Sequence, residues 1–167
     1  MIELHPMTEQ HVDRTCDWLA ASDQLRTQID TLDVPTPEGN RRYWQRNFED
    51  DSREDFAIIA DGTRHIGNCG LVNIDRRRAK AELWIYLGET YGKGFGRHAL
   101  SLLLDRAFGV LDLRRVYLRV VETNQRALAF YLRAGMKIEG HARSDTIQNG
   151  KSIDSILLSV LRDEYVR

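Results

Sequence analysis

The sequence predicts one mixed α/β domain, whose twisted sheet of about seven strands is antiparallel early and carries one central parallel pair, flanked by helices. Three observations predict this fold. The chain has 167 residues, the size of one domain, and no repeat or Pro/Gly/Ser linker divides it. Period-2 segments dominate residues 56–87. A strand–helix–strand unit over residues 81–121 requires a parallel pair with a right-handed crossover. We therefore expect residues 1–167 to form a single domain.

The first elements have clear start signals. We expect a short strand over residues 2–5 and a helix from the capping Thr8 to about Ala21. A second helix should begin at Thr36 and Pro37, because a hydroxyl cap followed by proline suits a first helical turn. That helix would carry Tyr43, Trp44 and Phe48.

A hairpin and a third strand follow. Residues 56–60 reach the turn Asp61-Gly62, and residues 65–74 read as the hairpin partner. Residues 81–87 form the next predicted strand. Its alternation divides the side chains between two faces, with Leu83, Ile85 and Leu87 on one and Glu82, Trp84 and Tyr86 on the other.

The second half of the sequence shows helical patterns as well as strand patterns. Residues 94–111 show a helical apolar stripe, and residues 115–121 form a β-branched strand. Asn124 should cap a shorter helix that Gly135 ends. A last pair of strands is expected between about Met136 and Leu161, joined near Asn149-Gly150.

Composition excludes several classes of protein. Lys plus Arg number 24 and Asp plus Glu 25, so the net charge of −1 argues against non-specific nucleic-acid binding. The two cysteines form no disulfide framework, and the five histidines include no i,i+4 pair that would bind a metal. No apolar run approaches the roughly 20 residues that span a bilayer, and the start lacks a signal-peptide pattern. We expect a cytoplasmic protein without metal, membrane or nucleic-acid partners.

The most informative segment is the glycine-rich loop of residues 88–99, between a strand and a helix. Its glycines expose successive amides at a helix N-terminus, which favours a bound phosphate. Residues 94–99 match the dinucleotide fingerprint G-x-G-x-x-A, but about eighty residues precede them and Glu122 poorly matches the expected acidic position. A P-loop is excluded because Lys93 precedes the last glycines and no Ser or Thr follows.

Two motifs resemble those of the Gcn5-related N-acetyltransferases. Residues 91–96, Tyr-Gly-Lys-Gly-Phe-Gly, resemble the pyrophosphate loop of that family, although Tyr91 stands where Gln or Arg is frequent. Residues 124–136 resemble the motif that follows it: an asparagine, a helical tyrosine, then glycine and an apolar residue. The resemblance covers nearly the whole chain and is weakest over residues 20–50. It is closest to the subgroup of ribosomal-protein-alanine, spermidine and amino-sugar acetyltransferases.

This resemblance implies acetyl-coenzyme A as donor and a small-molecule primary amine as acceptor, an amino sugar slightly ahead of a polyamine. The amine would attack directly, through a tetrahedral intermediate. A protein N-terminus is the alternative acceptor, and a non-catalytic coenzyme A-binding module is the alternative outside enzymes. A homodimer supported by the sheet edge and the C-terminal hairpin remains open.

The resemblance also implies a set of site residues. Backbone groups of the strand before the loop would hold the pantetheine arm, the loop amides would hold the pyrophosphate, and Asn124 would contact the cofactor region. The residues concerned are Ile85, Tyr86, Leu87, Gly92, Lys93, Gly94, Phe95, Gly96 and Arg97. Tyr131 is the expected acid for the leaving thiolate. An amine with a pKa near 10.4 needs a base or a water chain, for which Glu82 is the first candidate and Glu122 the second.

Overall fold

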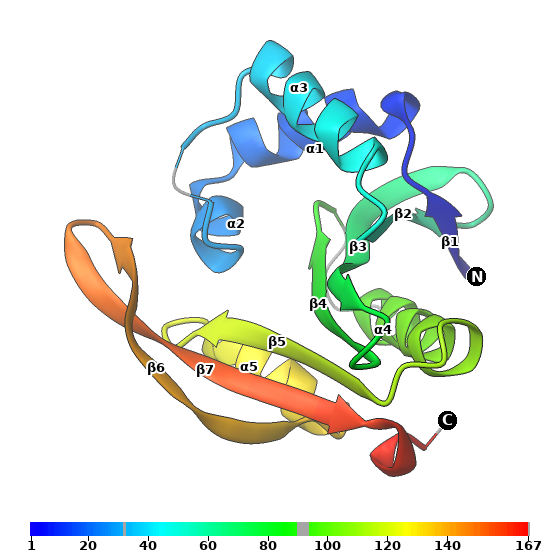
Figure 1. Ribbon diagram of the computed structural model, residues 1–167. Helices are drawn as coiled ribbons and strands as arrows, with labels where there is room; N and C mark the ends of the chain where they lie inside the picture. The colour runs from blue at the N-terminus through cyan, green and yellow to red at the C-terminus, as the bar shows by residue number, and fades with distance from the viewer. Residues whose placement is uncertain (32, 90–93, 167) are drawn as a thin grey trace.

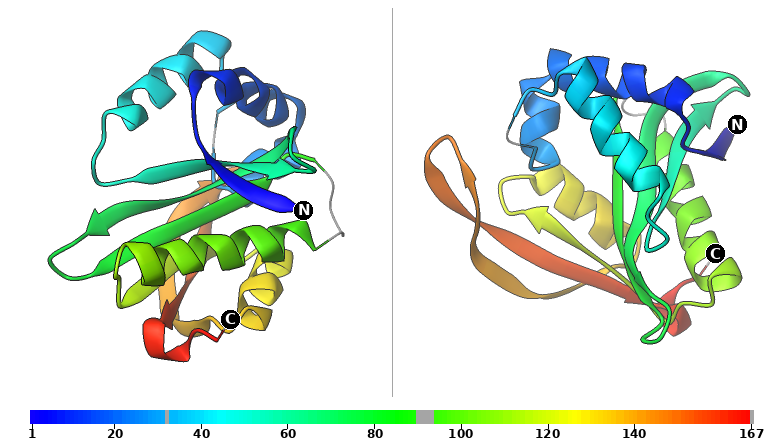
Figure 2. Two further views of the ribbon diagram at one scale, coloured as in Figure 1. Left: turned by 90° about the vertical axis from the view of Figure 1, so that its right-hand side faces the viewer. Right: turned by 45° about the horizontal axis from the view of Figure 1, so that its top comes forward.

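The computed structural model describes residues 1–31, 33–89 and 94–166. Within them, seven strands form one sheet in the order β1-β2-β3-β4-β5-β7-β6, and helices cover both faces (Figures 1 and 2). The strands are β1 Ile2–Pro6, β2 Glu54–Ala60, β3 Arg64–Asp75, β4 Lys80–Leu87, β5 Arg115–Val121, β6 Lys137–Gln148 and β7 Lys151–Leu161. The helices are α1 Glu9–Ala21, α2 Asp23–Gln28, α3 Pro37–Phe48, α4 Phe95–Asp105 and α5 Gln125–Arg133.

This arrangement confirms the predicted fold class. β4 and β5 pair in parallel, and every other neighbouring pair described in the sheet is antiparallel. Two details differ from the prediction. Helix α2 was not expected; it is one short segment in which the Ser22 hydroxyl accepts the Leu25 amide at 3.1 Å. The helix expected to reach residue 111 ends its α-helical part at Asp105 and continues as a π-helical turn over Arg106–Val110.

The predicted caps explain where the helices begin. The Thr36 hydroxyl accepts the Gly39 amide at 3.1 Å, with Pro37 in the first turn of α3. The Asn124 side chain accepts the Ala127 amide at 3.1 Å at the start of α5. Each cap gives an acceptor to an amide that has no partner within its own helix.

The sheet separates two apolar layers. The larger cluster lies between the sheet and α4 and α5, and it includes Ala99, Leu103 and Tyr131. On the other face, α1, α2 and α3 bury two smaller clusters, one around Trp44 and one around Trp18. Leu83, Ile85 and Leu87 belong to the first layer, whereas Trp84 and Tyr86 pack into the second. This confirms the two-faced alternation predicted for residues 81–87.

β4 and β5 share only a short parallel register. The partners are Lys80 with Arg115, Ala81 with Val116, and Glu82 with Tyr117. Beyond them, β4 stays paired with β3 and β5 stays paired with β7. The two strands therefore diverge in the middle of the sheet (Figure 1).

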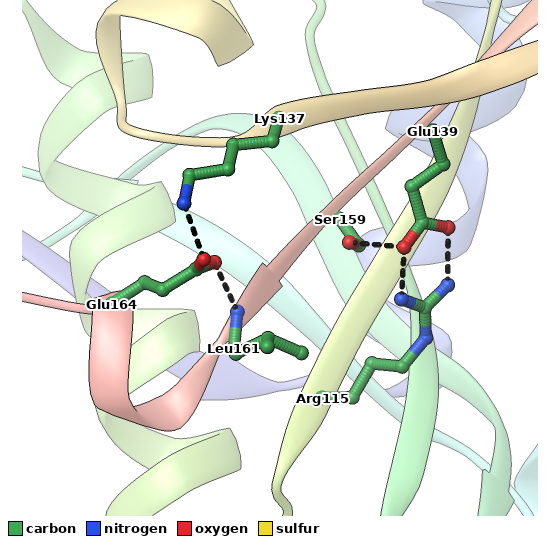
Figure 3. Close-up of polar contacts among 6 residues, drawn as sticks. All are labelled: Arg115, Lys137, Glu139, Ser159, Leu161 and Glu164. Carbon is green, nitrogen blue, oxygen red and sulfur yellow. Dashed lines mark hydrogen bonds and ion pairs between the residues drawn. The ribbon is translucent and has the colours of Figure 1, made fainter.

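Ion pairs hold the C-terminal strands together (Figure 3). The Arg115 guanidinium on β5 binds both carboxylate oxygens of Glu139 on β6, and Ser159 on β7 donates to the same carboxylate at 2.8 Å. These bonds lower the pKa of Glu139 to about 2. Lys137 pairs with Glu164, which also accepts the Leu161 amide at 3.1 Å. β5, β6 and β7 are thus connected by side-chain bonds to the 3₁₀-helical turn Arg162–Glu164 that follows β7.

β1 and β6 form the two edges of the sheet. A homodimer contact at such an edge stays a prediction. In the part of the chain that the structure describes, no helix is both long and apolar enough to cross a membrane.

Candidate active site

A cavity of about 1470 Å³ lies where β4 and β5 diverge. Its lining brings together ten of the residues that the sequence proposed for the site, from β4, from the starts of α4 and α5, and from α5 itself. They are Glu82, Ile85, Tyr86, Leu87, Gly94, Phe95, Gly96, Arg97, Asn124 and Tyr131. Gly92 and Lys93 lie outside the described residues. Glu122 is described, but it does not line this cavity.

The backbone of β4 presents peptide groups to the cavity. The Gly88 amide bonds to the Ile66 carbonyl of β3 at 2.9 Å, whereas the Ala79 carbonyl accepts the Arg114 amide on the β5 side at 2.8 Å. Because peptide groups alternate along a strand, those of Leu83 and Ile85 face the side from which β5 has diverged. That side of β4 is suited to bind an extended chain carrying amide groups, as a sheet edge binds a peptide.

The N-terminus of α4 lies at the same cavity. Gly94 adopts a left-handed backbone conformation, with φ of 75°, directly before the helix. The first helical bond described there is from the His98 amide to the Gly94 carbonyl, at 3.1 Å. The amides of Phe95, Gly96 and Arg97 thus precede the first intrahelical bond, and they favour an anion.

Tyr131 reaches the cavity from α5 and is 7% exposed. Burial raises the pKa of its phenol far above the usual value, with the buried Cys69 as a second cause. The phenol therefore holds its proton at neutral pH. Its ring packs edge-on against Phe130 with centroids 5.1 Å apart, which fixes its orientation.

Asn124 joins two elements beside the cavity. Besides capping α5, its side-chain amide donates to the Gln28 carbonyl at the end of α2, at 3.3 Å. The cap predicted from sequence is confirmed. A contact between Asn124 and a cofactor stays a prediction.

The two candidate bases lie in different places. Glu82 lines the cavity and accepts a hydrogen bond from the Asn73 side chain at 2.9 Å. Glu122 follows β5, and its backbone carbonyl accepts a bond from Gln125 at 2.7 Å. Neither placement assigns a base, but only Glu82 of the two is on the cavity lining.

Aromatic rings line the α1–α3 side of the cavity. Tyr43 and Trp44 of α3 and Trp84 and Tyr86 of β4 form a continuous aromatic wall. The successive ring centroids are 5.5 Å, 6.3 Å and 5.9 Å apart. Trp44 is 3% exposed and Tyr43 is 46% exposed, and both line the cavity.

The cavity lining carries both cationic and anionic side chains. Arg97 lies in the first turn of α4, Arg126 in the first turn of α5 and Arg133 at its last residue. Arg53 also lines the cavity, and Arg119 on β5 pairs there with Asp145 on β6 at 3.1 Å. The other carboxylates come from the α2–α3 connection, the turn after α3 and β4, namely Asp30, Asp33, Asp50 and Glu82. The sequence alone did not indicate that these charged side chains line one cavity, because they are far apart along the chain and meet only in the fold. No group of three metal-binding side chains occurs among the described residues.

Comparisons with known proteins agree with this geometry. A family model described as an acetyltransferase (GNAT) domain matches residues 2–137. The spermidine N(1)-acetyltransferase of Escherichia coli (strain K12) is 29% identical over 124 residues, which are 74% of this chain and 66% of that protein. The match thus covers slightly less than two thirds of that relative. A putative ribosomal N-acetyltransferase of Bacillus subtilis (strain 168) is 29% identical over 126 residues, which are 73% of this chain and 67% of that protein.

A solved structure shares the whole fold. The spermidine N-acetyltransferase of Vibrio cholerae, crystallised with CoA and spermine, superposes with a TM-score of 0.92 at 22% identity, covering 99% of this chain and 98% of that one. Since the family model matches most of the chain, the protein belongs to the acetyltransferase (GNAT) domain family.

Proposed function

We propose that the protein transfers an acetyl group from acetyl-coenzyme A to a primary amine of a polyamine. The observation that carries the proposal is that one cavity is lined by the amides at the start of α4 and also by the carboxylates of Asp30, Asp33, Asp50 and Glu82 beside an aromatic wall. An anionic donor and a cationic acceptor would each find the opposite charge there.

The donor end suits coenzyme A. The amides of Phe95, Gly96 and Arg97 at the start of α4 would hold the pyrophosphate, and nearby arginines would add charge-assisted bonds to phosphate oxygens. The peptide groups of Leu83 and Ile85 would bind the pantetheine arm, and an N–H of this strand would donate to the acyl oxygen. When bound, acetyl-coenzyme A supplies the acetyl group as an activated thioester.

The acceptor end favours a polyamine over the amino sugar that the sequence alone placed slightly ahead. Carboxylates attract an acceptor that carries several ammonium groups. The aromatic wall offers ring faces to ammonium groups and apolar surface to methylene segments. The spermidine acetyltransferases among the relatives support the same choice.

Two proton transfers remain for side chains of this protein. Glu82, or a water molecule that it holds, would take the proton that the arriving ammonium must lose. Tyr131, whose buried phenol stays protonated, would give a proton to the leaving sulfur. Glu122 is kept as the second candidate base.

A protein N-terminus is a second candidate acceptor, and the similarity to the putative ribosomal acetyltransferase favours it. Both candidates are tested by measuring thiol release from acetyl-coenzyme A with spermidine, putrescine, glucosamine, and a peptide with a free N-terminus. Fastest release with spermidine supports the proposal, and fastest release with the peptide supports the second candidate. Binding of coenzyme A without release by any amine would indicate a non-catalytic module.

A further inference from the structure

Four polar side chains lie between α1, β3 and β4 on the acceptor side of the cavity. Thr15, His65 and Asn68 are 1%, 6% and 0% exposed, and they lead to Tyr86 on the aromatic wall. The function proposed above uses the aromatic ring of Tyr86 but none of the polar groups of these four side chains. Buried polar groups of this kind are costly unless every donor and acceptor is satisfied, so their hydrogen bonds indicate what they hold in place.

Asn68 is the centre of this polar network. Its amide nitrogen lies 2.8 Å from the Thr15 hydroxyl and 2.8 Å from the Tyr86 hydroxyl. Its carbonyl oxygen lies 2.7 Å from Nε2 of His65. One side chain of β3 therefore contacts α1, β4 and its own strand.

The direction of these bonds follows from Thr15. The Thr15 hydroxyl donates its single hydrogen to the His11 carbonyl at 3.0 Å, so toward Asn68 its oxygen accepts. The nitrogen of the Asn68 side chain must then face Thr15 and Tyr86, and its oxygen must face His65. His65 carries a proton on Nε2 and donates it to that oxygen.

The network sets the position of the Tyr86 hydroxyl. The Tyr86 oxygen accepts from Asn68, and the Thr15 hydroxyl is the second side-chain partner of the phenol. Because Thr15 gives its own hydrogen to the His11 carbonyl, the phenol hydrogen points to the Thr15 oxygen, and the second lone pair of the Tyr86 oxygen is the acceptor that these four side chains leave open. Burial raises the pKa of the Tyr86 phenol far above its usual value, so the group remains a neutral hydroxyl. Tyr86 shares its face of β4 with Trp84 and Glu82, all three on the cavity lining.

We propose that the Tyr86 hydroxyl oxygen accepts a hydrogen bond from an amine N–H of the acceptor and that Asn68 is the positioning residue that holds this hydroxyl in place. The inference rests on the proposed function, and it deepens that function by assigning an acceptor contact outside the acid–base pair. His65 fixes the orientation of the Asn68 amide, and Thr15 anchors the network to α1.

Steady-state kinetics with acetyl-coenzyme A and spermidine test the assignment. Tyr86→Phe removes only the hydroxyl, and Asn68→Asp keeps the shape of the side chain but removes its amide donors. Each should raise the KM for spermidine about ten-fold, the size expected for one hydrogen bond to a charged ligand, with a smaller change in kcat and an unchanged Kd for coenzyme A. Tyr165→Phe makes the same chemical change outside this cavity and should leave the KM unchanged.

The double variant separates positioning from a structural role. If Asn68 acts through Tyr86, adding Asn68→Asp to Tyr86→Phe raises the KM no further. Independent effects that multiply, or a loss of coenzyme A binding in step with a lower Tm, would overturn the positioning role. An unchanged KM in Tyr86→Phe would overturn the contact itself, even if Asn68→Asp fails to fold. Absence of thiol release by the wild-type protein with every amine would overturn the proposed function and this inference together.

Discussion

Glu82 and Tyr117 are the last partners in the parallel register of β4 and β5. Past this pair the strands separate, and the candidate active site opens between them. The first candidate base thus lies where the sheet stops being continuous. Figure 1 shows the divergence of the two strands. The β4 peptide groups on that side face the cavity, and residues of α4 and α5 also line it.

Replacing Tyr131 by Phe should lower kcat at least ten-fold. The variant keeps the buried ring but removes the proton proposed for the leaving sulfur, and general acids contribute roughly 100-fold or more. Pre-steady-state thiol release measures the chemical step. Calorimetry should show that the variant binds coenzyme A with the same affinity as the wild type. An unchanged chemical step would remove Tyr131 from the acid role.

Replacing Glu82 by Gln should abolish the acidic limb of the profile of kcat/KM against pH. A carboxylate that accepts the amine proton must be ionised, so its loss removes the pH dependence it causes. The matched comparison is Glu122→Gln, which changes a carboxylate outside the cavity lining and should keep the limb. If the limb persists in Glu82→Gln and disappears in Glu122→Gln, the two assignments are reversed.

Replacing Gly88 by Ala should destabilise the protein by about 1–3 kcal/mol, because a methyl group there overpacks the site. A β-carbon at this position would lie 2.0 Å from the Trp18 ring. The midpoint of urea unfolding measures the change. Gly109→Ala is the control and should not destabilise, since outside its chain neighbours and its own helical backbone no atom lies within 4 Å of the β-carbon position. Equal effects of the two substitutions would contradict the packing of Trp18 on Gly88.

The stability of the folded protein should fall below about pH 6.5 in a way that depends on His65. Burial lowers the pKa of His65 in the folded protein below the value of 6.5 that it has in the unfolded chain. At a pH between the folded-state and unfolded-state pKa values, the unfolded chain therefore binds more protons than the folded one. The stabilisation is complete above pH 6.5 and is lost as the pH falls toward the folded-state pKa.

Urea unfolding at a series of pH values measures this dependence. His65→Gln should flatten the curve between pH 5 and 7, whereas replacing the exposed His98 by Gln should not. His11, whose pKa is also lowered by burial, would keep part of the slope in both variants. A wild-type slope retained in His65→Gln would contradict a neutral His65 in the buried network.

Local signals in the sequence were enough to predict most of the fold. Thr36-Pro37 and Asn124 are caps whose hydrogen bonds depend on neighbours three residues away, so their pattern predicts them correctly. The alternation of residues 81–87 likewise reflects burial on the two faces of β4. Helix α2 was missed because its six residues bury only Leu25 and show no apolar stripe.

Residues of the cavity lining were predicted where a contiguous motif or the alternation of one strand indicates them. Gly94 to Arg97 and Tyr131 lie within such motifs, and the fold brings them to one cavity. The network around Asn68 joins residues 15, 65, 68 and 86, whose contacts arise from strand register and the docking of α1. An asparagine and a histidine among the buried residues of β3 were the available signal, and no sequence spacing connects them to Tyr86.

The most direct test of the central claim is product analysis after incubating the protein with acetyl-coenzyme A and spermidine. We predict one N-acetylated spermidine, identified by mass spectrometry, for each thiol released, with much slower release when glucosamine replaces spermidine. Thiol release without an acetylated amine, or faster acetylation of glucosamine or of a peptide N-terminus than of spermidine, would contradict the assignment of this cavity to a polyamine.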